Sequence, residues 1–164
     1  MKKIGVFYGS STGNTEAIAK TIAKRLDADC YNVANKPANE IQQYSSLILG
    51  TSTWGVGDLQ DDWERFIGEL TKADLTGKKV ALFGLGDSDT YPDNFVDGLG
   101  LIYEAIKSKG CTFIGAVETD GYNFSESRAV VEDHFVGLPL DEDNESKLTR
   151  ARLDKWLEEI TKAL

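Results

Sequence analysis

The chain has 164 residues, of which 41% are hydrophobic, and it carries 27 acidic against 18 basic residues, a net charge of −9. This length allows one sizeable hydrophobic core, so we expect a single domain over residues 1–164. The negative charge argues against nucleic acid or an anionic membrane as a partner and favours proteins with basic surfaces. The chain has no apolar run of membrane-spanning length and no secretory signal at its start, which predicts a cytoplasmic protein.

The residue types present give little support to metal-based redox chemistry. Cys30 and Cys111 fall in predicted strands and form no C-x-x-C motif, which indicates buried reduced thiols rather than a disulfide or a redox pair. His134 is the only histidine, so a zinc or iron–sulfur site would lack ligands, and we expect no metal site. Any redox chemistry must then come from an organic cofactor.

Short apolar runs alternate with segments of helical periodicity along the whole chain. The runs that predict strands are residues 4–8, 29–33, 47–50, 80–83 and 112–117. The segments that predict helices are the stripe of Ile18, Ile22 and Leu26, a weak segment at 41–44, and the stripes within 63–70, 95–106 and 153–164. Such repeated β–α units predict an α/β fold: a doubly wound, five-stranded parallel sheet with helices on both faces.

The loop after the first predicted strand has the composition of a phosphate-binding loop. It reads Gly-Ser-Ser-Thr-Gly-Asn-Thr over residues 9–15 and leads into the first helix. A helix N-terminus carries partial positive charge and unpaired N–H groups, and small residues let a phosphate approach the backbone. The P-loop of nucleotide hydrolases and the G-x-G-x-x-G dinucleotide motif both fail to match here. The remaining alternative is a capped helix after an ordinary turn.

Two further loops are expected at the same edge of the sheet. Right-handed crossovers bring every strand-to-helix loop to the carboxyl ends of the strands, where such folds bind ligands. The loops at 51–58 and 84–95 are rich in glycine and acidic residues, and each holds one aromatic side chain, Trp54 or Tyr91, outside any apolar stripe. One such aromatic would be expected to pack back onto its own loop. Two of them beside a phosphate-binding loop predict a site that holds a planar ring between them.

With these motifs in order, the sequence resembles the flavodoxin family, and in particular its long-chain type. The resemblance covers essentially the whole chain and is carried by residues 10–15, 53–60, 84–87, 91–95 and 140–144. The segment from about Glu118 to Val136 resembles the family's insertion, which splits the fifth strand. The resemblance implies strand order 2-1-3-4-5, noncovalently bound FMN and one-electron transfer at low potential.

The family pattern also implies which residues bind the cofactor. The first loop would bind the phosphate, Trp54 and Tyr91 would stack on the ring, and Asp87 would face its pyrimidine edge. Asp143 matches a position that contacts the ribityl chain, although its acidic surroundings would otherwise pass for a solvated charge run. The full predicted set is Ser10, Ser11, Thr12, Gly13, Asn14, Thr15, Thr51, Ser52, Thr53, Trp54, Gly55, Val56, Gly57, Leu85, Gly86, Asp87, Tyr91, Asn94, Phe95 and Asp143.

The same resemblance gives the Gly55–Val56 peptide a specific role. In the family, this peptide turns so that its carbonyl accepts a hydrogen bond from the flavin N5–H when the flavin is half reduced. Glycine at position 55 makes that turn sterically easy, because glycine alone adopts positive φ without strain. The alternative is that Gly55 and Gly57 are ordinary turn residues.

The predicted function is a monomeric electron carrier, nucleotide-binding and acidic, that shuttles electrons between a reductase and acceptor redox enzymes with basic docking surfaces. The phosphate-binding loop contains no lysine or arginine, so the phosphate charge would oppose formation of an anionic reduced flavin. Two alternatives remain. An FMN-dependent NAD(P)H:quinone reductase of similar fold would need space over the ring that Trp54 and Tyr91 would cover. A receiver-type regulatory domain would need an acidic metal pocket after the first strand, and Tyr8-Gly9-Ser10 does not provide one.

Overall fold

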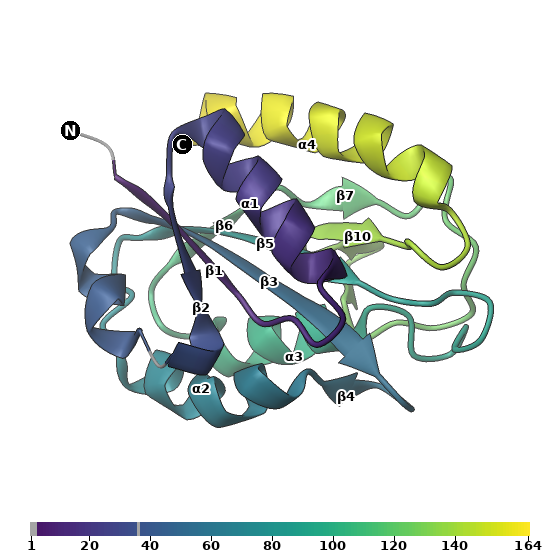
Figure 1. Ribbon diagram of the computed structural model, residues 1–164, viewed down its shortest axis with the longest axis horizontal. Coiled ribbons are helices and arrows are strands. Elements are labelled where there is room, and N and C mark those ends of the chain that lie inside the picture. The colour runs from purple at the N-terminus through teal and green to yellow at the C-terminus, as the bar shows by residue number, and fades with distance from the viewer. Residues whose placement is uncertain (1–2, 36) are drawn as a thin grey trace.

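The computed structural model describes residues 3–35 and 37–164. Its centre is a twisted parallel sheet in the order β2-β1-β3-β5, with the fifth position shared by β6 and β10, which both pair with β5 (Figure 1). This arrangement confirms the predicted α/β fold and the strand order 2-1-3-4-5. The central strands are β1 (Ile4–Tyr8), β2 (Asp29–Asn32), β3 (Ser46–Trp54), β5 (Lys79–Leu85), β6 (Thr112–Ile114) and β10 (Leu138–Leu140).

Helices cover both faces of the sheet. In Figure 1, α1 and α4 lie over one face and α2 and α3 over the other. The helices are α1 (Asn14–Leu26), α2 (Asp61–Lys72), α3 (Asp97–Ile106) and α4 (Thr149–Ala163). Short 3-10 turns occur between β2 and β3, η1 (Val33–Asn35) and η2 (Ala38–Gln43), and before α4, η3 (Ser146–Leu148). Within the described residues, no helix is both long and apolar enough to cross a membrane.

The strands read as continuous apolar runs because both of their faces are buried. In β1, Val6 packs in the cluster beneath α1 and α4, and the next residue, Phe7, packs in the cluster beneath α2 and α3. Ile48 and Leu49 divide between the same two clusters. Side chains alternate between faces along a strand, so a parallel sheet covered on both sides needs apolar residues at successive positions.

The fifth strand is split, as the long-chain resemblance implies. Its first half, β6, ends at Ile114, three residues earlier than the predicted strand 112–117, and its second half is β10. The chain leaves the sheet at Gly115, where φ is +83° and the carbonyl accepts a hydrogen bond from Trp156 Nε1 at 2.8 Å. The insertion therefore begins before the predicted 118–136 segment. It forms a small antiparallel sheet of β7 (Val117–Glu118), β8 (Val130–Val131) and β9 (His134–Phe135).

The structure also differs from the predictions elsewhere, and three of these differences have a clear physical reason or bear on the site. The third strand runs on through its polar residues to Trp54, because it pairs with β5 on one side and with the short antiparallel β4 (Asp58–Leu59) at its end. The weak segment at 41–44 forms the end of the 3-10 turn η2 and the extended residue Tyr44 that follows it. The helix predicted from Phe95 begins at Asp97, because Val96 is in the left-handed region with φ +48°, an uncommon conformation for a β-branched residue.

Candidate functional site

A cavity of about 390 Å³ lies at the carboxyl edge of the sheet, beside the switch point between β1 and β3. The loops after β1, β3, β5 and β10 all contribute to its wall. Its lining residues are Thr12, Asn14, Thr15, Ser52, Thr53, Trp54, Gly55, Leu85, Gly86, Asp87, Tyr91, Glu142 and Asp143. Every one of them except Glu142 belongs to the set predicted from the sequence, so the fold brings most of that set together in one place.

The first loop presents an open helix N-terminus to this cavity. Gly13 occupies the N-cap position of α1 with φ +95°, and no side chain caps the helix there. Ser10 Oγ accepts a hydrogen bond from the Gly13 N–H at 3.1 Å, which holds the loop in a tight turn. The first-turn N–H groups of α1, together with the hydroxyls of Thr12 and Thr15, are thus available to an anion.

Two large aromatic side chains line the cavity while remaining exposed to solvent. Trp54 is 41% exposed and Tyr91 is 38% exposed, whereas the other two tryptophans, Trp63 and Trp156, are buried. The Trp54 indole is held in place by a hydrogen bond from its Nε1 to Ser52 Oγ at 2.9 Å. Aromatic surface left exposed on two loops that share one cavity is suited to stacking on a flat ligand.

The loop that follows Trp54 contains two residues with positive φ. Gly55 has φ +52° and Gly57 has φ +87°, and between them Val56 is 76% exposed. Gly57 is further restricted, because a Cβ at this position would lie 2.6 Å from Asp97 Oδ2. Gly55 borders the cavity, and a Cβ at this position would meet only Asp58 Oδ2, at 3.3 Å.

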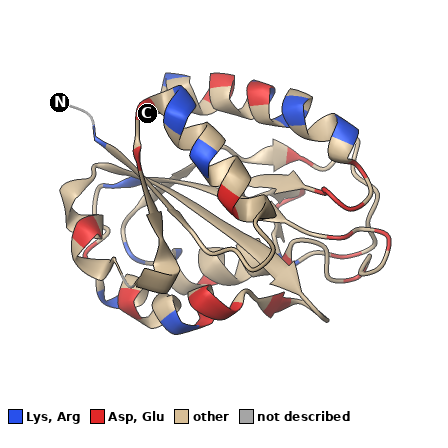
Figure 2. Cartoon of the chain, viewed as in Figure 1, with Lys and Arg blue, Asp and Glu red and all other residues tan. Residues whose placement is uncertain are grey.

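The cavity wall is acidic. Asp87, Glu142 and Asp143 all line it, and among the described residues no lysine or arginine does. Partial burial raises the pKa of Asp87, but hydrogen bonds from Thr90 and Asn144 outweigh burial and leave the pKa below its usual value. Burial first, and then three neighbouring acidic side chains, raise the pKa of Asp143. Figure 2 shows acidic residues along the loops at this end of the molecule and on α2, whose first turn contains Asp61, Asp62 and Glu64.

Asp141 holds two loops of the site together, a role that the sequence analysis missed. Its side chain is fully buried, and its Oδ2 accepts hydrogen bonds from the Ser88 N–H at 3.1 Å and the Ser88 hydroxyl at 2.6 Å. Its Oδ1 accepts from the Asn144 N–H at 3.0 Å. The carboxylate therefore ties the loop after β5 to the loop after β10. Asp141 directly follows an apolar strand, which is the one indication of this role in the sequence. The acidic residues around it are instead typical of a solvated surface.

Eight residues of the predicted set lie outside the cavity lining. Some support the site from behind: the buried Thr51 donates a hydrogen bond to the Ser52 carbonyl, and the Asn94 amide donates to Asp97. Phe95 is buried and packs against aromatic residues of the insertion, so it belongs to the core rather than to the wall of the cavity. The eight residues are Ser10, Ser11, Gly13, Thr51, Val56, Gly57, Asn94 and Phe95.

The insertion supports the loop that carries Tyr91. The Pro92 carbonyl accepts hydrogen bonds from the N–H groups of Ser125 and Glu126, and the Phe95 N–H donates to the Glu126 carbonyl. In addition, the Ser127 hydroxyl donates to the Phe95 carbonyl. The segment of the insertion that precedes β8 thereby fixes the backbone of the loop that carries Tyr91.

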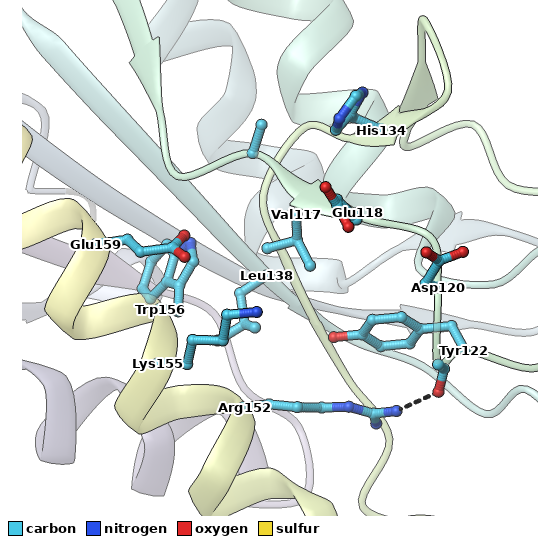
Figure 3. A pocket seen from close by; sticks show the side chains of 12 residues that line it. Val117, Glu118, Asp120, Tyr122, His134, Leu138, Arg152, Lys155, Trp156 and Glu159 are labelled. Carbon is cyan, nitrogen blue, oxygen red and sulfur yellow. Dashed lines mark hydrogen bonds between the residues drawn. The ribbon is translucent and has the colours of Figure 1, made fainter.

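A second cavity, of about 600 Å³, lies between α4 and the insertion and contains none of the predicted residues. Figure 3 shows its charged lining, in which Arg152 lies over the Tyr122 ring at 4.0 Å and donates to the Gly121 carbonyl. Arg152 also forms an ion pair with Glu145, so its guanidinium is already engaged. The described residues contain no cluster of histidine, cysteine and acidic side chains placed to hold a metal.

Sheet order 2-1-3-4-5, an uncapped helix N-terminus after the first strand and two exposed aromatics around one cavity define a mononucleotide-binding protein of the flavodoxin-like class. The sequence profile of the family described as flavodoxin matches residues 6–156. The chain therefore belongs to the flavodoxin family.

Individual relatives agree with this assignment. A flavodoxin from a Synechocystis species is 47% identical over 164 residues, covering 98% of this chain and 96% of the relative. Flavodoxin 1 of Escherichia coli is 43% identical, covering 98% and 93%. The structure of Fusobacterium nucleatum flavodoxin bound to flavin mononucleotide superimposes with a TM-score of 0.93 at 35% identity, covering 100% of this chain and 99% of that one.

Proposed function

We propose that residues 1–164 form one domain that binds FMN noncovalently in the 390 Å³ cavity and carries electrons one at a time at low potential. The observation that carries this proposal is the pair of exposed aromatics, Trp54 and Tyr91, lining the same cavity as an uncapped helix N-terminus. A planar ring and an anionic tail are the two parts of FMN, and the site offers a surface suited to each.

Each part of the site has its own task in this proposal. The loop at 10–15 binds the phosphate with hydroxyls and backbone N–H groups. Trp54 and Tyr91 stack on the ring, Asp87 and the backbone near it face the pyrimidine edge, and Asp143 lies beside the ribityl chain. Leu85, the last residue of β5, and Gly86, which follows it, line the cavity. Ser52 and Thr53 fix the end of β3 by accepting hydrogen bonds from the Trp54 indole and the Gly98 N–H.

The charge of the site favours a low potential. FMN supplies reversible one-electron chemistry when bound, and its reduced form gains negative charge. The acidic wall and the absence of lysine or arginine among the described lining residues make that added charge costly. For a one-electron couple, about 1.4 kcal/mol of such destabilisation lowers the potential by about 59 mV.

The protein acts as a carrier rather than as an enzyme. A quinone reductase of similar fold needs room over the ring for nicotinamide and quinone, and here the exposed aromatics stand on the loops around the ring site. The named relatives are flavodoxins throughout, which does not favour the reductase alternative.

The partners that we propose are redox proteins with basic docking surfaces: a flavodoxin reductase and oxidoreductase acceptors. The first turn of α2 carries Asp61, Asp62 and Glu64 close in sequence to the Trp54 loop, and this acidic surface would steer a basic partner towards the ring. We further propose a monomer that does not bind nucleic acid or membranes. Cys30 and Cys111 are free thiols, in keeping with a reducing compartment such as the cytoplasm.

An absorption spectrum of the purified protein, before and after addition of FMN, tests the proposal. We expect bound flavin with strongly quenched fluorescence, reduction in two separable one-electron steps, and no oxidation of NAD(P)H without a partner protein. Electron transfer from a basic reductase should slow steeply as salt screens the attraction. Folded protein that ignores added FMN would refute the proposal, and unaided NAD(P)H oxidation would favour the reductase.

A further inference from the structure

Gln60 is a buried polar residue next to the site that none of the roles above uses. It precedes α2, is 1% exposed, and lies outside the cavity lining. Its Oε1 accepts hydrogen bonds from the N–H groups of Asp62 at 3.0 Å and Trp63 at 3.2 Å, which caps α2. Backbone N–H groups can only donate, so the oxygen must face them and the amide nitrogen must face the opposite way.

That nitrogen points at the phosphate-binding loop. Gln60 Nε2 donates to Ser11 Oγ at 3.1 Å and to Asp62 Oδ2 at 2.9 Å. A serine hydroxyl has one proton to donate and two lone pairs to accept with. Because the amide donates to a lone pair of Ser11 Oγ, the hydroxyl proton is directed away from Gln60, and Ser11 itself lies exposed on the loop.

The packing beneath the loop leaves room for this amide and for little else. A Cβ on Gly9 would lie 2.3 Å from Gln60 Oε1 and 2.7 Å from Trp63 Cδ1. Trp63 Nε1 and the Gly9 N–H both donate to the Gly50 carbonyl, at 2.7 Å and 3.1 Å. The start of α2 and the start of the loop are thus locked together, with the Gln60 side chain between them.

We propose that Gln60 is a positioning residue for phosphate recognition: its amide holds Ser11 so that the hydroxyl donates its proton to the phosphate of the bound nucleotide. The inference rests on the proposed function, because it assigns the loop at 10–15 to the FMN phosphate. It adds a residue from a different element, the start of α2, to the machinery that selects a phosphorylated flavin.

The test compares FMN with riboflavin, which has the same ring and lacks the phosphate. Affinities of the apoprotein for both are measured by quenching of flavin fluorescence in Gln60→Met, Ser11→Ala and the double variant. We expect Ser11→Ala to weaken FMN binding about tenfold and Gln60→Met to weaken it at least about fivefold. The double variant should bind FMN no more than about twofold more weakly than Ser11→Ala. Riboflavin affinity should change less than about twofold in all three. The control Gln43→Met removes an amide that contacts Glu40 on the distant η2 turn and should alter neither affinity.

The outcomes separate the two proposals. Wild-type protein that does not bind FMN overturns the proposed function itself. If the wild type binds FMN, three results overturn the role of Gln60 alone. These are equal losses of affinity for FMN and riboflavin, fully additive losses of FMN affinity in the double variant, and no loss of FMN affinity in Ser11→Ala. If Gln60→Met does not fold, Gln60→Glu replaces it, because it keeps the acceptor that caps α2 and loses the amide donor. Gln60→Glu should then reduce FMN affinity by a factor at least about fivefold larger when Ser11 is present than in the Ser11→Ala background. Equal reductions in the two backgrounds refute the inference.

Discussion

Replacing Asp141 with asparagine should destabilise the protein far more than removing the same charge two residues away. In Asp141→Asn, one carboxylate oxygen becomes an amide nitrogen, and the backbone N–H groups of Ser88 and Asn144 can only donate. One buried N–H is then left without an acceptor, at a cost of about 1–3 kcal/mol, and the remaining bonds lose the charge that roughly doubles their strength. The expected loss in unfolding free energy is about 3 kcal/mol, or about 6–12 °C in Tm for a domain of this size.

Urea denaturation of the apoprotein, followed by circular dichroism, measures this loss as a lower midpoint with an unchanged slope. The matched control is Asp143→Asn, which removes one negative charge from an exposed position on the same loop. FMN affinity should fall with Asp141→Asn as well, because the two loops that Asp141 joins both line the cavity. Equal midpoints for the two variants would show that the buried carboxylate does not hold the loops together.

Three further outcomes are expected. Burial and then neighbouring charges raise the pKa of Asp143, so its ionised form destabilises the folded state. Asp143→Asn should therefore raise Tm at neutral pH. This gain in Tm should vanish as pH falls below the pKa of the unfolded state, about 4. A gain that persists at pH 3 contradicts this cause. Gly55→Val places a β-branched residue at φ +52°, so the maximum fraction of half-reduced flavin in a reductive titration should fall, and an unchanged fraction removes the role of this peptide. Ser127→Ala removes the hydroxyl that donates to the Phe95 carbonyl and accepts from the Ala129 N–H; it should lower stability by about 1–2 kcal/mol and weaken FMN binding several-fold, whereas unchanged FMN affinity would show that the insertion does not order the Tyr91 loop.

The strands were predictable because burial on both faces leaves a strong apolar signal. Val6, Phe7, Ile48 and Leu49 are all buried, and each falls within a predicted strand. The extension of β3 through residues 51–54 was not predictable in this way. Those residues are polar, and they continue the strand because Thr51 and Ser52 stay in register with Gly84 and Leu85 of the neighbouring strand. Pairing between distant segments overrides local composition here.

The candidate site was likewise predictable only where the local sequence alone marks a residue. The small and hydroxyl residues of its loop indicate Gly13, and Trp54 and Tyr91 are indicated because they lie outside any apolar stripe. Trp54 and Tyr91 line the cavity, and Gly13 lies between the lining residues Thr12 and Asn14. The role of Asp141 was not predicted, and the sequence places Phe95 in the predicted cofactor set although Phe95 packs in the core. A buried carboxylate is recognised by its partners, and Ser88 lies 53 residues away along the chain. The partners of Phe95, which lie in the insertion, are likewise distant in sequence.

The split of the fifth strand has a consequence for the order of assembly. β5 pairs with β6 along its first residues, Lys79 to Ala81, but along its last residues, Phe83 to Leu85, it pairs with β10. β10 lies about fifty residues further along the chain, so its pairing with β5 closes a longer loop than the pairing of β6 does. The end of β5 that borders the cavity is paired on this side only when β10 is in place. A nascent or partly unfolded chain can therefore hold most of its sheet while still unable to retain a nucleotide.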